Sequence, residues 1–196
     1  MHGFSVMEMV VALAIFSITA TYSLAIFVQS NTVQKRTANI QKTMSDARYV
    51  LEIISREARM GLVDYSYYGG TLPAMPIESN NDNILALKDS DDNSLYFRRY
   101  LAQADPERYV IQINYDNSEW LDITPEDLNI TRLDFYISPN QDPFVWQTGG
   151  YFNNIQPIIT IVLETMGTDF EGGTLTESGG RISHFQTTIA SRKYRR

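Results

Sequence analysis

Between Gly3 and Gly61 the chain contains neither glycine nor proline, so 57 consecutive residues hold nothing that breaks a helix. The first half of this stretch is apolar on all sides, and the second half is amphipathic. Gly61 directly follows Met60 and is a residue typical of helix C-termini. The sequence therefore predicts a single helical rod, roughly 85 Å long at 1.5 Å per residue, that ends at Gly61.

The rod begins with a segment suited to a membrane. Residues 9–28 are twenty positions without a charge, enough to cross about 30 Å of hydrocarbon as a helix. A cleaved secretory signal would have a basic start and a shorter apolar run, whereas only His2 precedes this one. We therefore expect a retained anchor, with residues 4–28 as the transmembrane part and residues 29–60 as the amphipathic part of the helix.

The amphipathic part carries an apolar stripe whose residues lie mostly three or four positions apart. The stripe consists of Val33, Ile40, Met44, Ala47, Leu51, Ile54 and Ala58. The charged residues between them are Lys42, Arg48, Glu52, Arg56 and Arg59. This spacing predicts a helix that packs one face on a sheet. A free coiled-coil stalk is the alternative, but the stripe is short and a β-rich region follows it.

Beyond Gly61 the pattern changes from helical to alternating. Six segments have the alternation and composition of strands: residues 84–88, 95–101, 109–115, 128–137, 158–164 and 182–190. Thr124 followed by Pro125 is a helix-start signature and predicts one short helical turn. The expected fold class is α+β, with one long helix packed on an antiparallel sheet in a head that spans residues 61–196.

Charge is segregated along the chain. The 196 residues include 23 acidic and 16 basic ones. Residues 33–60 contain six basic and three acidic residues, residues 61–180 contain five basic and nineteen acidic ones, and residues 181–196 contain five basic ones only. The acidic head argues against a nucleic-acid interface on that surface, because phosphate contacts need clusters of Lys and Arg.

One carboxylate, Glu8, lies in the otherwise apolar start of the rod. A charge near the core of a bilayer is costly, so such a residue is a functional candidate with a partner. The expected partner is the amino terminus of another copy, since two opposite charges in a low-dielectric bundle attract while a single one is penalised. The alternative is an interfacial carboxylate that faces lipid headgroups.

The segment Gly3-Phe4-Ser5-Val6-Met7-Glu8, followed by the apolar run, resembles the processing site of type IV prepilins and of the pseudopilins of type II secretion. In that family a glycine precedes a phenylalanine, and a glutamate is the fifth residue of the mature chain. The resemblance implies cleavage after Gly3, N-methylation of Phe4, and pairing of Glu8 with the amine of a neighbouring subunit. His2 stands where the family usually has Lys or Arg.

Later segments resemble the J-type minor pseudopilins of type II secretion and the related W-type minor pilins. The matching segments are residues 128–136, Trp146, residues 156–161, and residues 185–189 with Arg192. These motifs are looser than the amino-terminal one. The resemblance implies a pilin-like fold and a membrane-anchored minor pilin or pseudopilin. Such a subunit would assemble into a type IV pilus or a type II secretion filament, at its initiation or tip.

The same resemblance implies partners and a location. The partners would be other pilin or pseudopilin subunits, the prepilin peptidase and the inner-membrane assembly platform. The chain would cross the inner membrane once, with its amino terminus in the cytoplasm and its head exported. Lys35 and Arg36, which follow the anchor, would favour the opposite orientation by charge alone. A single-pass protein whose exported head binds a ligand without polymerising is the alternative function.

Two further patterns in the head are candidate sites. Asp89, Asp91 and Asp92 offer oxygen ligands for calcium, but the loop departs from an EF-hand and fits a solvated hairpin turn better. The same two interpretations apply to three acidic residues of a glycine-rich loop: Asp169, Glu171 and Glu177. Asn129 matches an extended glycosylation sequon over residues 127–131, but it also opens a predicted strand.

The sequence offers little for catalysis. It has no cysteine, and histidine occurs only at positions 2 and 184, so thiolate or imidazole metal sites and a Cys/His nucleophile are not available. It also lacks a serine nucleophile elbow and a glycine-rich phosphate loop. We therefore expect no enzyme activity and no cofactor. His184 is expected to be an exposed or hydrogen-bonded strand residue.

A basic segment surrounds Tyr194. It consists of Arg192, Lys193, Arg195 and Arg196. Three interpretations are open: a solvated end after the last strand, a segment that docks on the acidic head of an adjacent subunit, and a contact to DNA in an uptake filament. Nucleic acid is not expected as the main partner.

Overall fold

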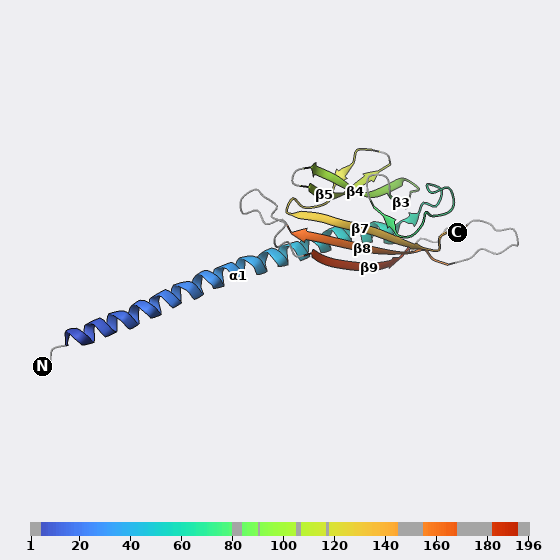
Figure 1. Cartoon of the computed structure of the whole chain (residues 1–196). Helices are drawn as coiled ribbons and strands as arrows, with labels where there is room; N and C mark the ends of the chain where they lie inside the picture. Colours follow the sequence, from blue (N-terminus) through green and yellow to red (C-terminus); the bar gives the residue numbers. More distant parts are fainter. Residues whose placement is uncertain are drawn as a thin grey trace. The chain divides into compact units, whose positions relative to one another are not determined.

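The computed structural model describes residues 5–79, 84–89, 91–104, 107–116, 118–144, 155–167 and 182–191. Within these ranges the chain forms one long helix followed by nine strands, all in antiparallel sheets (Figure 1). The fold class is therefore α+β, as the sequence predicts. The chain divides into two compact units, Met1–Gln41 and Lys42–Arg196.

The helix α1 spans Val6–Met60 without interruption, which confirms the single rod. It ends at Gly61, whose N–H donates to the Glu57 carbonyl oxygen at 2.8 Å. Gly61 does not have a positive φ. A Cβ at this position would instead lie 2.7 Å from the carbonyl oxygen of Lys88. The predicted stop at Gly61 is thus confirmed, and the missing side chain allows two backbone segments to approach closely there.

In the first unit, α1 exposes its side chains on every side. All residues from Ser5 to Gln41 are exposed, and the apolar part reaches a mean hydropathy of 2.1. The hydroxyls of Ser17, Thr19 and Thr21 donate to carbonyl oxygens four residues earlier, at 2.8, 3.0 and 2.8 Å. Such internal bonds satisfy polar groups where no water is present. This part of α1 is compatible with a single-pass membrane anchor.

The second unit contains two antiparallel sheets, with the strand orders β1-β3-β4-β5-β6 and β2-β7-β8-β9. The first sheet consists of β1 (Leu62–Val63), β3 (Leu85–Lys88), β4 (Ser94–Ala104), β5 (Glu107–Tyr115) and β6 (Leu121–Asp122). The second consists of β2 (Ile77–Glu78), β7 (Leu128–Ser138), β8 (Ile158–Gly167) and β9 (Ile182–Ala190). The six longer strands confirm the six predicted segments. The three two-residue strands were not predicted, because two residues carry no periodicity.

The expectation of a single sheet is wrong. The consecutive long strands β5 and β7 belong to different sheets, because β6 folds back onto β5 through the pairs Gln112–Asp122 and Ile113–Leu121. β7 pairs instead with β2 on one side and with β8 on the other. Alternation shows that a segment is a strand, but it does not show which strand lies beside it.

The single short turn expected after Thr124 is confirmed, although Thr124 does not cap it. The chain makes one turn there, in which the Leu128 N–H donates to the Pro125 carbonyl oxygen at 3.1 Å. The Thr124 hydroxyl does not cap a helix but accepts a hydrogen bond of 2.7 Å from the Ile111 N–H in β5. A tertiary contact has replaced the local capping that the sequence suggests.

The core lies between the two sheets and the second half of α1. The helix buries Ala47, Val50, Leu51, Ile54, Ser55 and Ala58. The strands contribute large side chains that are less than 2% exposed, among them Phe97, Ile111, Phe135 and Ile161. Each such apolar side chain contributes about 1.5–3 kcal/mol when it leaves water. This packing confirms the prediction that the second half of the helix packs one face on a sheet, and it excludes the free coiled-coil stalk.

The buried stripe is shorter than predicted. Val33, Ile40 and Met44 are 56%, 37% and 40% exposed, so these three residues do not pack on the sheets. Val33 and Ile40 belong to the first unit, which ends at Gln41. Val50, which the stripe omitted, is fully buried. Helical spacing identifies a face, but only the position of the head determines how far along the helix that face is covered.

A half-buried arginine joins the two sheets. Arg99 extends from β4 and donates to the carbonyl oxygens of Ile130 and Thr131 in β7, at 3.3 and 2.6 Å. These carbonyls lie where the register between β7 and β8 shifts by one residue. The Arg99 guanidinium also lies 4.2 Å from the centre of the Tyr109 ring. Arg99 therefore supplies hydrogen bonds at the point where the regular ladder is interrupted.

Candidate functional site

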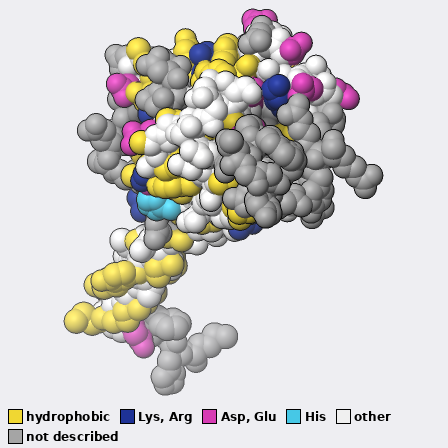
Figure 2. All heavy atoms as spheres, turned by 90° about the vertical axis from the view of Figure 1, so that its right-hand side faces the viewer, with side chains coloured by type: hydrophobic (Ala, Val, Ile, Leu, Met, Phe, Trp, Pro, Cys, Tyr) yellow, Lys and Arg dark blue, Asp and Glu magenta, His cyan; other side chains and the backbone are white. Residues whose placement is uncertain are grey.

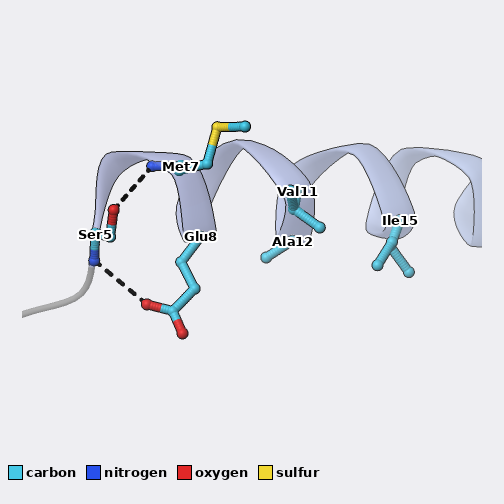
Figure 3. Close-up of a pocket in the computed structure, with 6 residues that line it drawn as sticks. All are labelled: Ser5, Met7, Glu8, Val11, Ala12 and Ile15. Atoms are coloured by element: carbon cyan, nitrogen blue, oxygen red, sulfur yellow. Dashed lines mark hydrogen bonds between the residues drawn. The ribbon is translucent and has the colours of Figure 1, made fainter.

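The structure places Glu8 in the first turn of α1, where it caps its own helix (Figure 3). The Glu8 carboxylate accepts a hydrogen bond of 3.3 Å from the Ser5 N–H. In return, the Ser5 hydroxyl accepts one of 3.4 Å from the Met7 N–H. A serine followed three residues later by a glutamate is a capping box, which satisfies two free N–H groups at a helix start. Glu8 therefore sets where the rod begins.

The surroundings of Glu8 are apolar. Val11, Ala12 and Ile15 follow it at three, four and seven positions, and together they line one shallow surface of the helix (Figure 3). Figure 2 shows acidic side-chain atoms next to a segment whose other side chains are hydrophobic or uncharged. Among the residues that the structure describes, Glu8 accepts this one hydrogen bond, through one of its two carboxylate oxygens.

No basic side chain of the described helix lies near Glu8 in sequence. After Ser5, the first basic residue along α1 is Lys35, which is 27 positions away. The positive end of the helix dipole favours a negative charge at this place but does not neutralise it. A cationic partner for Glu8 must therefore come from outside the described helix. The predicted cleavage and methylation residues, Gly3 and Phe4, and His2 before them, lie outside the described residues.

The calcium candidates form the turn between β3 and β4. One carboxylate oxygen of Asp89 accepts hydrogen bonds from the N–H groups of Asp91 and Asn93, at 2.7 and 3.1 Å. Asp92 has a φ of 69° and lies 3.4 Å from the Lys88 ammonium. The Asp89 side chain thus stabilises the hairpin turn. This agrees with the interpretation of the loop as a solvated turn. The described residues contain no group of three His, Cys, Asp or Glu side chains that could hold a metal ion.

The glycosylation candidate Asn129 is 5% exposed. Its side-chain oxygen accepts a hydrogen bond of 2.9 Å from the Tyr109 N–H, and its amide nitrogen donates to the Glu107 carbonyl oxygen at 3.1 Å. Both partners belong to β5, so Asn129 joins the two sheets. A glycan on this nitrogen would remove the bond to Glu107 and would have no space. The structure thus assigns Asn129 a structural role.

His184 lies on the outer side of β9, where it is exposed, and its Nδ1 is 3.3 Å from the Glu164 carboxylate in β8. This placement confirms the prediction that His184 is an exposed residue of a strand. The remaining candidates lie outside the described residues. They are Asp169, Glu171, Glu177, Trp146 and the basic segment Arg192, Lys193, Arg195 and Arg196.

Sequence reasoning identified Glu8 but missed its partner Ser5. The signal was available, because the spacing Ser-x-x-Glu before an apolar run is a capping signature. Comparisons of the chain with protein-family models, with curated proteins and with solved structures found no match. The assignment of the site therefore rests on its residues and their geometry.

Proposed function

We propose that this chain is a membrane-anchored minor pilin or pseudopilin, a subunit that joins a filament through its amino-terminal rod. One observation carries the proposal: a single carboxylate, Glu8, lies in the first turn of a 55-residue helix whose residues 9–28 are uncharged and exposed. A soluble protein would have to leave that surface in water. A bilayer and then a bundle of similar rods would each cover it.

Glu8 would act by pairing with an amine of a neighbouring subunit. Cleavage between Gly3 and Phe4 would create a positive amino group four positions before Glu8. Within an apolar bundle, the attraction between such charges is strong, and an unpaired carboxylate is penalised. The contact therefore favours one axial register of the rods over others.

The capping box supports this role by orienting the carboxylate. Ser5 holds one oxygen of Glu8 against the helix start, and the second oxygen would accept a hydrogen bond from the neighbour's amine. A side chain fixed in this way loses less conformational entropy when it binds. Ser5 is thus a positioning residue in the proposal, and Glu8 is the residue that makes the contact between subunits.

Residues 61–196 would be the exported head, and the prepilin peptidase and the inner-membrane assembly platform would act on the anchor. The machine could be a type IV pilus or a type II secretion filament, at its initiation or tip, since the same anchor serves both. The alternative remains a single-pass binding module that does not polymerise. Subunit association separates the two functions, because only a filament subunit needs Glu8 to meet another copy.

The decisive experiment compares Glu8→Ala with Glu8→Gln in membranes that hold two differently tagged copies of the full chain. Co-purification of the two tags in mild detergent measures association. We expect Glu8→Ala to lose association, and Glu8→Gln to lose nearly as much, because an amide can cap the helix but carries no charge. Undiminished association of Glu8→Ala would contradict the filament function and favour the non-polymerising module.

A further inference from the structure

The helical part of the second unit has an exposed face of unusual composition. We call it the arginine stripe and define it as Arg48, Tyr49, Glu52, Arg56, Arg59 and Met60. Most of its members are separated by three, four or seven positions in the sequence, so they lie on one side of α1. Tyr49 and Met60 are each 58% exposed, and the Arg56 side chain is 60% exposed. The opposite side of the same turns is buried in the core.

The stripe has the composition of an interface. Arg, Tyr and Met are enriched where proteins bind each other, whereas a merely solvated helix face is usually rich in Lys and Glu. Here three arginines, a tyrosine and a methionine accompany a single acidic residue. Arg56 pairs with the adjacent Glu57 at 3.0 Å. In the described part of the chain, Arg48 and Arg59 have no ion pair, so the stripe keeps a positive charge that a partner could neutralise.

The same head carries a surface of opposite charge, which we call the acidic tip and define as Asp91, Asp92, Asp116 and Glu119. All four are exposed. Two turns bring them to one end of the first sheet: Leu95 pairs with Tyr115, and the Asp116 N–H donates to the Ser94 carbonyl oxygen at 2.7 Å. Among the described residues, only Lys88 forms an ion pair with this tip.

The end of the stripe and the tip lie on neighbouring parts of one molecule, because Leu62, two residues after Met60, pairs with Lys88, whose ammonium pairs with Asp92. No ion pair joins a stripe arginine to a tip carboxylate among the residues that the structure describes. Each copy therefore presents two complementary surfaces that differ from one another. In a contact between two copies, the stripe of one copy meets the tip of the other.

From this charge complementarity we infer that the arginine stripe docks the acidic tip of a second copy of this chain. The inference rests on the proposed function, because two heads can meet in this way only if the amino-terminal helices of the two copies lie next to each other. It extends that function by adding a contact between heads to the contact between rods. Long-range attraction between stripe and tip would also guide the approach of subunits and would weaken in high salt.

Site-specific disulfide formation tests the contact, because the chain contains no cysteine of its own. Two full-length copies with different tags are expressed together, one with Arg56→Cys and one with Asp92→Cys, and their membranes are oxidised mildly. We expect a covalent pair that carries both tags. Glu126→Cys is the matched control for Asp92→Cys, since Glu126 is acidic and exposed but lies beside Asp127, which pairs with Lys42 far from the tip.

Charge reversal tests the cause of the contact. Arg48→Glu with Arg59→Glu in the first copy should reduce the covalent pair roughly tenfold, the effect of losing one close charge pair. Asp91→Lys with Asp116→Lys in the second copy should restore it. All four positions are exposed, but Asp116 has a φ of 50°, so circular dichroism of each variant must first show that the fold is retained. Reduction without restoration would overturn the electrostatic contact.

A cysteine on the rod distinguishes this inference from the proposed function. Ile40→Cys lies on the exposed part of α1 and reports whether rods stand side by side. If Ile40→Cys forms covalent pairs and the Arg56/Asp92 combination does not, the stripe contact is overturned while the filament function stands. If neither combination forms pairs, self-association itself is contradicted. Cross-linking of Arg56→Cys to a different protein, without the Asp92→Cys copy, would also overturn the inference.

Discussion

The Thr43 side chain of α1 lies directly against Gly167 at the end of β8, so closely that a Cβ on residue 167 would collide with the Thr43 hydroxyl. In the same region Lys42 forms an ion pair with Asp127. These contacts lie at the start of the second unit, where α1 begins to pack on the sheets. The absence of a side chain at Gly167 allows this close approach.

Gly167→Ala should therefore destabilise the head by about 1–3 kcal/mol, the usual cost of overpacking. Urea unfolding followed by circular dichroism measures the change. Thr43→Ala removes the colliding oxygen and supplies the control. Gly167→Ala should cost clearly less in that background, and an equal cost in both backgrounds would exclude the Thr43 contact as the cause.

Asn129→Ala should destabilise the head by about 1–3 kcal/mol, because it leaves the Tyr109 N–H and the Glu107 carbonyl without their partner inside the protein. Thermal or urea unfolding measures the loss. Thr188→Ala in β9 is the comparison: it removes only an exposed hydrogen bond of 2.9 Å to Thr160 and should cost less, about 0.2–1 kcal/mol. Intact-protein mass spectrometry of the unaltered chain should show no glycan on Asn129, and a glycan there would contradict the structural role.

Stability should fall in alkaline solution. Burial raises the pKa of Tyr65 and of Tyr68 above the ordinary value, and the Tyr65 hydroxyl donates to the Pro139 carbonyl oxygen at 2.8 Å. Each tyrosine stays protonated in the folded chain while it ionises in the unfolded chain above about pH 10. The unfolded state then binds fewer protons, so each tyrosine lowers the free energy of unfolding by up to about 1.4 kcal/mol per pH unit.

Urea unfolding between pH 9 and about 11 measures this slope. Tyr65→Phe removes one of the two groups and should make the slope shallower. A slope that is the same in the unaltered chain and in Tyr65→Phe would contradict the burial of this hydroxyl.

Processing at the Gly3–Phe4 bond should be visible in the purified protein. Mass spectrometry should find a mature chain that begins with N-methylated Phe4 when the prepilin peptidase is present. Gly3→Val should block the cut, because a peptidase that recognises glycine before the bond has no space for a larger residue. An unaltered chain that still begins with Met1 would contradict processing. The Glu8 contact is tested separately by the Glu8 variants.

The orientation of the anchor can be measured directly. Protease added to intact spheroplasts should degrade the head, since the proposed topology places residues 61–196 outside the cytoplasm. Changing Lys35 and Arg36 to glutamine should leave this result unchanged if the processing machinery rather than loop charge sets the orientation. Protection of the head in the unaltered chain would reverse the topology and exclude an exported filament.

The candidate site could be predicted almost entirely from sequence, because it is local. Glu8 stands out as one carboxylate in an apolar run, and its partner Ser5 is three residues away, within the reach of a capping box. The role of Asn129 could not be predicted. Its sequon is a local pattern, whereas the bonds to β5 that make the amide unavailable join residues about 20 positions apart.

The sequence by itself determined the elements: one uninterrupted helix that ends at Gly61 and six longer strands, because helix breakers and alternation act within a few residues. Only the tertiary structure decided how these elements are arranged. It separated β5 from β7 into two sheets, limited the buried part of the helix stripe to residues from Ala47 onward, and required Gly61 and Gly167 for close approach. These outcomes depend on which surfaces meet, and packing between distant segments selects them through contacts that no local pattern encodes.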